Sequence, residues 1–469
     1  MLTLRQPWSA HRSWAPYRVI LPAITGCMML IASILPWFND PGGTKLTAWQ
    51  LPVDLGWQLR FGFLNYGLLC TCCTLTIFTI SWQAWQIFHA QQSADPTQLL
   101  ATAHIDMKQR YRQAYLLCLL PSALFLFQFL VADMGMMAEV ARNQIQLELA
   151  RSHFGYATMP EFMPILPFTL HPLHLSDRIA ILFDQIGLGF FMPLFSLLAL
   201  WLTRAFWSHS TQQTGWVQPP LSRQHHLLTY GLALLGILIL GRPSLALLSH
   251  YQAVHALDAG NYSKALQWLD QARLLNPTLD ALPDYHSERG QAQYFLHPQH
   301  PGIESETYLG AYYLTQNDIY TSYQTLQNAW HAYPHTPWLR DELSIALAQL
   351  AEMNKPLNGP SQARLVNDEP ALPWLDELIN IDSSNVYAQF TTGRILCELH
   401  AYGSCEAHMR VVLNLQQSPE LRSAAYTYIA ISRFGLGDTI NAREYLYKAQ
   451  DFDPSYRNNT ARQYMSGMR

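Results

Sequence analysis

Long apolar runs separated by short polar connections make up the first half of the chain. Each run holds about 20 residues or slightly more with almost no charge, the length of a helix that crosses the hydrocarbon core of a bilayer. Only a helix or a closed barrel satisfies its own backbone polar groups there. We therefore predict a transmembrane domain at residues 1–245 with about five spans. These spans are expected at residues 19–38, 62–88, 114–137, 179–202 and 227–248.

From about residue 246 the apolar positions instead follow helical hairpins with a repeated signature. Three copies start at Gly260, Asn317 and Gly437, and a small residue, a leucine, an alanine and a proline recur at the same offsets after each start. In the first copy these are Ala265, Leu269, Ala272 and Pro277. The others are Ser322, Leu326, Ala329 and Pro334, and then Ala442, Leu446, Ala449 and Pro454. A small residue also recurs in each preceding helix, as Ala253, Gly310 and Ala430.

This spacing resembles the tetratricopeptide repeat (TPR) over residues 246–456. Small residues let two helices approach closely, the larger leucine fills the groove between them, and proline ends the second helix. One hairpin cannot bury its own apolar face, so such units stack into arrays. The predicted fold class is all-α, a polytopic transmembrane bundle followed by a TPR-like α-solenoid and a C-terminal tail at residues 457–469.

The two halves differ in charge. Residues 1–249 carry 14 Lys and Arg against 10 Asp and Glu, a net charge of +4, whereas residues 250–469 carry 15 against 23, a net charge of −8. The acidic half has no basic stripe, so we expect no nucleic-acid partner. The basic residues cluster before the first predicted span and in the second and fourth connections. The positive-inside rule then predicts a cytoplasmic N-terminus and an extracytoplasmic repeat domain, in a bacterial plasma membrane.

Ionisable residues within the apolar half are candidates for an ion path or for chemistry. Asp133 and Asp184 lie in or beside predicted spans, where an ionised carboxylate costs about 3 kcal/mol at the bilayer centre. The alternative is that both lie near the outer surface or form a hydrogen bond with a neighbouring helix. His171 and His174 form a His-x-x-His pair in the long outer loop, a weak metal-ligand pattern, so we predict no metal and no cofactor.

The resemblance to TPR arrays also implies a concave surface, lined by the first helix of each repeat, that holds an extended peptide or a helix. The side chains assigned to this groove combine aromatic rings with one arginine, which suits a peptide or an amphipathic helix. The alternative is that several of them pack inside the superhelix or against the long outer loop. The assigned residues are His250, Val254, Thr307, Tyr308, Ala311, Tyr312, Tyr387, Phe390, Arg394, Thr427 and Ile431.

Cys397 and Cys405 are the only cysteines of the repeat half, and they lie symmetrically about residue 401, on either side of the turn at residues 401–403. Four residues before and four after residue 401, the two side chains can face each other at the Cα separation of a disulfide, about 5.5 to 6 Å. Such a bond fits an oxidising compartment. The alternative is two small residues at close-packed helix positions.

Two functions of different classes follow from these patterns. The first is a membrane-anchored scaffold that binds a protein partner outside the cytoplasm, as a subunit or assembly factor of a larger membrane or envelope complex. The second is a membrane enzyme or transporter component of envelope polymer synthesis or export, with the repeats recruiting partners. We favour the scaffold, because the repeat half contains no phosphate-binding loop, nucleophile motif or zinc motif.

Overall fold

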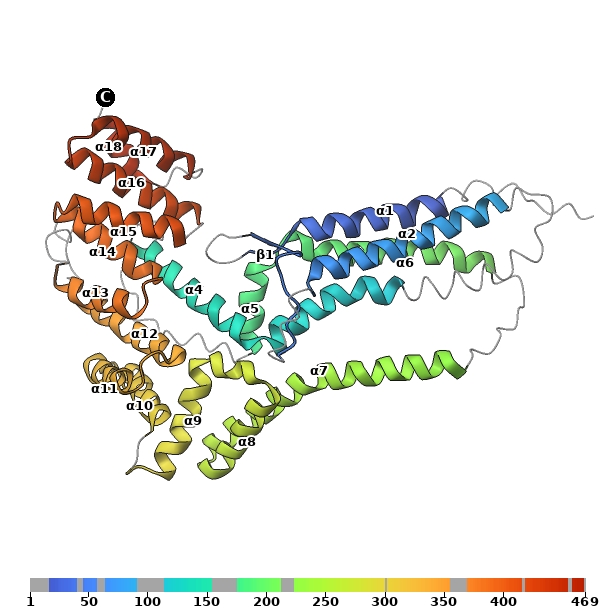
Figure 1. Ribbon diagram of the computed structural model, residues 1–469, viewed down its shortest axis with the longest axis horizontal. Coiled ribbons are helices and arrows are strands. Elements are labelled where there is room, and N and C mark those ends of the chain that lie inside the picture. Colours follow the sequence, from blue (N-terminus) through green and yellow to red (C-terminus); the bar gives the residue numbers. More distant parts are fainter. Residues whose placement is uncertain are drawn as a thin grey trace, which may run out of the picture. The chain divides into compact units, whose positions relative to one another are not determined.

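The computed structural model is largely helical in the parts that it describes (Figure 1). These parts are residues 17–39, 45–56, 64–90, 114–153, 175–211, 223–299, 302–354, 369–415, 418–453 and 458–467. The chain forms two compact units. The first unit comprises Met1–Asn39, Lys45–Ala132 and Leu182–Arg242, and the second comprises Asp40–Thr44, Asp133–Ile181 and Pro243–Arg469.

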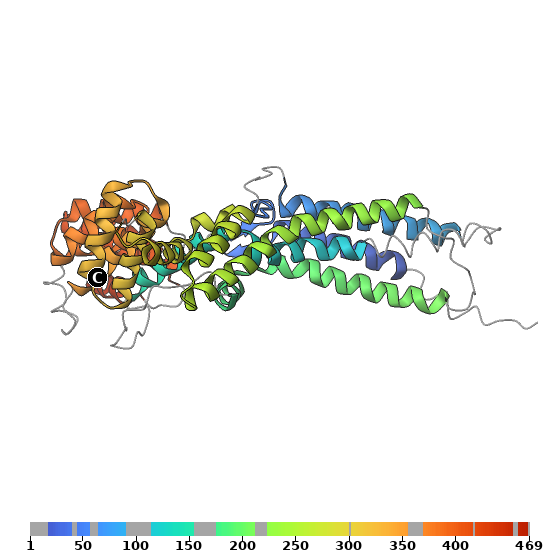
Figure 2. The same cartoon turned by 90° about the horizontal axis from the view of Figure 1, so that it is seen from below.

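The first unit is built on apolar helices. Helix α1 (Tyr17–Ile34) packs against α2 (Tyr66–Ala90) and α6 (Leu188–Thr211), and the three run side by side in both views (Figures 1 and 2). A further helix, Ala114–Ala132, ends in a π-helical turn at Gln128–Ala132. A short hairpin joins β1 (Pro36–Asn39) to β2 (Lys45–Thr47), antiparallel and with Phe38 opposite Leu46.

Two helices in the described part of the chain are long and apolar enough to cross a membrane. They are Tyr66–Gln86 and Ala114–Ala132, while the apolar helices Ile20–Ile34 and Leu188–Trp201 are shorter. The prediction of about five spans is therefore supported for two helices only. The predicted span at residues 227–248 lies within one continuous helix, α7 (Arg223–Asp258).

The span predicted at residues 179–202 is wrong as a single helix. Two residues, Ile186 and Gly187, separate the end of helix α5 (Leu175–Gln185) from the start of α6 at Leu188. In the break, the backbone N–H of Gly187 donates to the carbonyl of Trp37 at 2.9 Å. A Cβ atom on Gly187 would lie 2.2 Å from the carbonyl oxygen of Pro36, so only glycine allows the β1 strand this close.

A buried aromatic core holds the first unit together beside this break. The ring centroid of Trp37 lies 5.4 Å from that of Tyr66 and 5.6 Å from that of Phe125. The Tyr66 hydroxyl donates to Gln128 Oε1 at 2.7 Å, and the same oxygen accepts from the backbone N–H of Asp54 at 3.0 Å. The polar side chain of Gln128 is thus paired inside the core, as a buried amide must be.

The second unit is an array of helical hairpins preceded by one helix from the first half of the chain. Its helices are α4 (Met134–His153), the last part of α7, α8 (Tyr262–Leu275), α9 (Pro283–Leu296), α10 (Ile303–Thr315), α11 (Ile319–Ala332), α12 (Pro337–Met353), α13 (Leu372–Ile381), α14 (Val386–Glu398), α15 (Tyr402–Leu415), α16 (Pro419–Gly435), α17 (Thr439–Asp451) and α18 (Asn459–Gly467). From α8 to α18, each helix packs against the next in sequence order. Single 3₁₀ turns, η2 (Pro277–Ala281) and η4 (Glu369–Ala371), precede α9 and α13.

The three repeated turns have the geometry that their sequences predict. Gly260, Asn317 and Gly437 start the copies with positive φ angles of 71°, 62° and 83°. The next residue caps the second helix of each pair: for example, Asp318 accepts from the backbone N–H of Thr321 at 3.2 Å. The small residues and leucines at the repeated offsets are fully buried. They are Ala265, Leu269, Ala272, Ser322, Leu326, Ala329, Ala442, Leu446 and Ala449.

Two features depart from the predicted domain limits. The second unit includes Asp133–Ile181, although the predicted transmembrane domain extends over residues 1–245. The predicted tail at residues 457–469 contains a helix, α18, that closes the array. Ala461 of α18 is buried in a cluster with Ala430 and Leu446.

Candidate protein-binding surfaces

Most of the predicted groove residues of the TPR-like array lie in its interior. The side chains of Thr307, Tyr387, Phe390 and Thr427 are fully buried, and those of His250 and Arg394 nearly so. Val254, Tyr308, Ala311 and Ile431 are half-buried, and Tyr312 is 45% exposed. The predicted residues therefore do not form one open groove, and only Tyr312 and the half-buried ones offer surface to a partner.

Part of the predicted groove is covered by α4 of the same chain. Leu147 and Ala150 of α4 are buried in one apolar cluster with Val386 and Phe390 of α14. The side-chain oxygen of Gln146 accepts a hydrogen bond from the backbone N–H of Val386 at 3.2 Å. Residues 147 and 150 belong to the predicted long outer loop, so for Phe390 the structure agrees with the alternative interpretation of packing against that loop.

The other end of α4 packs against the first repeat. Met134 is fully buried with Leu279 and Tyr285, and its backbone N–H donates to Thr278 Oγ1 at 3.2 Å. Midway along the helix, Arg142 pairs with Asp341 of α12 at 3.4 Å. Helix α4 therefore contacts the array at the first repeat, at α12 and at α14.

The two acids that were candidates for an ion path have different surroundings. Asp133 is nearly buried at the start of α4, and its Oδ1 accepts from the backbone N–H of Met136 at 3.0 Å. Asp133 thus caps α4, a structural role for which an aspartate is well suited. Asp184 is exposed near the end of α5. The two residues belong to different compact units, and His171 and His174 lie outside the described residues.

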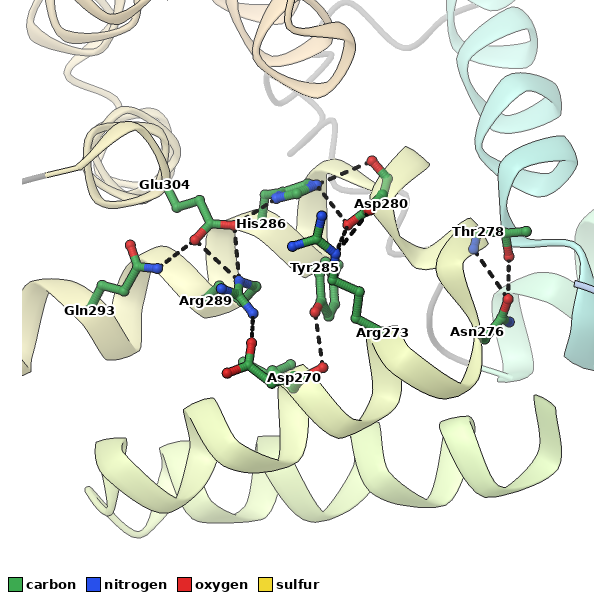
Figure 3. Close-up of polar contacts among 11 residues, drawn as sticks. Asp270, Arg273, Asn276, Thr278, Asp280, Tyr285, His286, Arg289, Gln293 and Glu304 are labelled. Atoms are coloured by element: carbon green, nitrogen blue, oxygen red, sulfur yellow. Dashed lines mark hydrogen bonds and ion pairs between the residues drawn. The ribbon is translucent and has the colours of Figure 1, made fainter. Parts of the chain in front are cut away.

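A polar network fixes the irregular helix α9 between α8 and α10 (Figure 3). Glu304 of α10 lies at the centre of this network. Its carboxylate accepts hydrogen bonds from His286 Nδ1 and Arg289 Nε, both at 2.9 Å, and from Gln293. Arg289 also pairs with Asp270 of α8. Each charge in the network therefore has an opposite charge or a donor beside it.

The pKa values of this network follow from its burial and its pairing. Burial opposes the ionisation of Glu304, but hydrogen bonds from His286 and the charge of Arg289 outweigh it and hold the pKa of this carboxyl below its ordinary value. Burial raises the pKa of Tyr285 to about 12, and its hydroxyl donates to the carbonyl of Leu269 at 2.9 Å. Because these groups satisfy one another, the network serves to position α9.

Gly290 makes the close approach of α9 and α10 possible. A Cβ atom at this position would lie 1.8 Å from the backbone oxygen of Glu304. Tyr294, one turn after Gly290, and the adjacent Phe295 lie beside Tyr308 of α10, with centroid separations of 6.1 Å and 6.4 Å. The close approach at Gly290 thus brings aromatic rings of α9 and α10 together.

Tyr294 and Phe295 belong to a continuous surface group that we call the aromatic cluster. Phe295 stacks on Tyr262 of α8 with a centroid separation of 4.7 Å, and it lies 6.4 Å from Tyr308 of α10. Tyr308 lies 6.3 Å from Tyr312. The members, from three neighbouring helices, are Tyr262, Tyr294, Phe295, Tyr308, Tyr312 and Tyr313.

All six rings retain exposed surface, and Phe295 and Tyr312 are 48% and 45% exposed. Among the described residues, the hydroxyls of Tyr294, Tyr308 and Tyr312 have no protein hydrogen-bonding partner. Burial, together with the neighbouring tyrosines, raises the pKa of Tyr308 above its ordinary value. A neutral, partly exposed group of rings with available hydroxyls is typical of a protein-binding surface.

The repeat register predicted only two members of this cluster, Tyr308 and Tyr312. It missed Tyr294 and Phe295 because α9 has no counterpart in the repeat pattern, and it did not include Tyr262 of α8 or Tyr313 of α10. The adjacent pair Tyr294–Phe295 near the end of a polar helix was the available signal.

Cys397 and Cys405 form a disulfide across the turn between α14 and α15, with a Cα separation of 5.1 Å. Five cysteines are free thiols: Cys27, Cys70, Cys72, Cys73 and Cys118. The described residues contain no group of three or more His, Cys, Asp or Glu side chains that can hold a metal ion.

Comparisons with known proteins give a likeness over less than half of the chain. No protein-family model matches the chain, and no curated protein matches it. A solved structure of MamA from AMB-1 is 15% identical and covers 44% of this chain and 91% of its own, with a TM-score of 0.26. YrrB, described as a TPR protein with an unusual peptide-binding site, is 15% identical over 46% of this chain and 90% of its own, with a TM-score of 0.24. Scores this low carry no argument, so the TPR-like character of the array rests on its hairpins, capped turns and buried repeat positions.

Proposed function

We propose that this protein is a membrane-anchored helical-repeat scaffold that binds another polypeptide on the extracytoplasmic side of a bacterial plasma membrane. In this role it is a subunit or an assembly factor of a larger membrane or envelope complex. The bilayer holds its apolar helices, and the partner contacts the aromatic cluster of the repeat array.

The observation that carries the proposal is the exposed aromatic cluster on α8, α9 and α10. Tyrosine and phenylalanine supply large contact areas with few rotatable bonds, and they are enriched where proteins bind one another. The predicted groove also favours this site. Helix α4 covers the part of the groove on α14, whereas Tyr308 and Tyr312 of α10 keep exposed surface.

The membrane and its outer side are supported by independent features. Tyr66–Gln86 and Ala114–Ala132 are long and apolar enough to cross a bilayer. The distribution of Lys and Arg favours a cytoplasmic N-terminus. The Cys397–Cys405 disulfide suits an oxidising compartment.

Site-specific photo-crosslinking in intact cells tests this proposal. A benzoylphenylalanine in place of Tyr312 is expected to give a discrete protein adduct on irradiation. The matched control carries the same residue in place of Tyr447, which is 54% exposed on α17 outside the aromatic cluster. Adducts at 312 but not at 447 support the scaffold, whereas equal yields at both positions, or none at 312, contradict it.

A further inference from the structure

The surroundings of the aromatic cluster are strongly acidic. Residues 246–320, which contain α8, α9 and α10, hold eight Asp and Glu against three Lys and Arg, a net charge of −5. Both arginines of this stretch are engaged within the array: Arg273 pairs with Asp280 at 2.9 Å, and Arg289 pairs with Glu304 and Asp270. The third cation of the stretch, Lys264 of α8, is exposed. With all three counted, the net charge remains −5.

One acid next to the aromatic cluster, Asp258, has no cationic partner among the described residues. Asp258 is exposed and ends α7 four residues before Tyr262, the first residue of α8. A positive charge brought to this exposed carboxylate by a partner would stabilise the complex.

The rings themselves favour a cation. The face of an aromatic ring is negative, and it attracts a guanidinium or ammonium group placed above it. The rings lie next to one another along the three helices. Their centroid separations range from 4.7 Å, between Tyr262 and Phe295, to 6.4 Å, between Phe295 and Tyr308. Rings and carboxylates thus select the same sign of charge.

We propose that the aromatic cluster binds an extended polypeptide segment rich in arginine or lysine, with the basic side chains over the rings and beside Asp258. This inference rests on the proposed function and specifies the chemistry of its partner. An anionic membrane surface is disfavoured, because the same carboxylates would repel its headgroups.

Binding of designed peptides to the full chain in neutral detergent tests the inference. The probe is a short labelled peptide of alternating proline and arginine, and its control has glutamate at each arginine position. The arginine peptide is expected to bind and to weaken as salt rises, because its charges are screened. The combined change Tyr308→Ala and Tyr312→Ala is expected to weaken binding about tenfold, or about 1.4 kcal/mol. Tyr447→Ala is expected to leave binding unchanged.

Two further variants separate chemistry from folding. Tyr308→Phe with Tyr312→Phe keeps both ring faces, so it is expected to retain binding within about twofold. Asp258→Asn removes the neighbouring acid, and it is expected to weaken binding of the arginine peptide several-fold and to flatten its salt dependence.

Three results would overturn the inference. They are equal binding of the glutamate peptide, an unchanged affinity in the Tyr308→Ala and Tyr312→Ala variant, and preferential binding of vesicles rich in anionic lipid. None of these changes the photo-crosslinking result at residue 312. A discrete adduct there, combined with any of them, leaves the scaffold in place and rejects only the basic partner.

Discussion

Gln146 and Val386 are 240 residues apart in the sequence, yet the side-chain oxygen of Gln146 accepts the backbone N–H of Val386 at 3.2 Å. This buried hydrogen bond joins a helix from the first half of the chain to the fourth hairpin of the array. It satisfies a donor at the start of α14 that has no partner within its own helix.

Gln146→Ala is expected to destabilise the second unit by about 1 to 3 kcal/mol, because it leaves that N–H buried without an acceptor. Hydrogen exchange of the full chain in detergent measures the effect, with faster exchange expected in α4 and at the start of α14. Asn143→Ala, on the less buried face of the same helix, is the control. Unchanged protection in Gln146→Ala contradicts the docking of α4.

Gly290→Ala is expected to disrupt the contact between α9 and α10. The added Cβ would lie 1.8 Å from the backbone oxygen of Glu304, so one helix must move, at a cost of about 3 kcal/mol or more. Gly403→Ala is the matched control, because a Cβ there meets nothing within 4 Å. It is expected to be neutral or to stabilise α15 by up to about 1 kcal/mol.

Thermal unfolding of the two glycine variants gives the comparison. A large loss of melting temperature in Gly290→Ala, with none in Gly403→Ala, is the expected result. Equal melting temperatures would show that α9 and α10 are not held this closely.

Acidification is expected to remove the stability that Glu304 contributes. Its pKa in the folded protein is below the ordinary value of 4.5, so the contribution is complete above about pH 4.5 and is lost as the pH falls through the folded value. The melting temperature of Glu304→Gln should therefore lie below that of the parent protein at pH 7, and the gap should close toward pH 3. The control is Glu444→Gln, a change at an exposed carboxylate. A difference in melting temperature between the two proteins that stays constant from pH 7 to pH 3 would contradict this prediction.

Counting thiols tests the disulfide. The chain has seven cysteines, and five are free in the structure. Alkylation of the denatured, non-reduced protein should modify five thiols, and prior reduction should raise the number to seven. If all seven thiols were modified without reduction, the disulfide would be absent, and it would no longer support an outer location of the repeat array. Cys397→Ser with Cys405→Ser is expected to cost about 2 to 3 kcal/mol, the loop-entropy estimate for so short a loop.

The repeat sequence predicted the array well where local chemistry decides the structure. Gly260, Asn317 and Gly437 must adopt positive φ angles, and the residues after them cap helices, so the turns follow from a few positions. Leu326 and its equivalents are buried because they occupy the closest approach of two helices. Such features depend on neighbours within about 20 residues, which a sequence pattern can capture.

Long-range packing explains what the sequence did not predict. The close approach of Trp37 breaks the apolar segment at Gly187, and only the glycine in an otherwise apolar run hints at it. Asp133 suggested an ion path, but it caps α4, a helix whose polar residues contact distant repeats. The aromatic cluster was predicted in part, because Tyr308 and Tyr312 follow the repeat register whereas Phe295 lies on a helix outside it.

The most direct measurement of the central claim is the labelling of single introduced cysteines, in a chain whose native free thiols are replaced, by a membrane-impermeant maleimide. The account predicts that Tyr447→Cys reacts rapidly in intact cells. Tyr312→Cys should react slowly in native membranes and rapidly after the protein is purified away from its partner. Labelling of both sites only after the cells are opened, or equally fast labelling of residue 312 in both states, would contradict an outward-facing array with its aromatic cluster covered by another polypeptide.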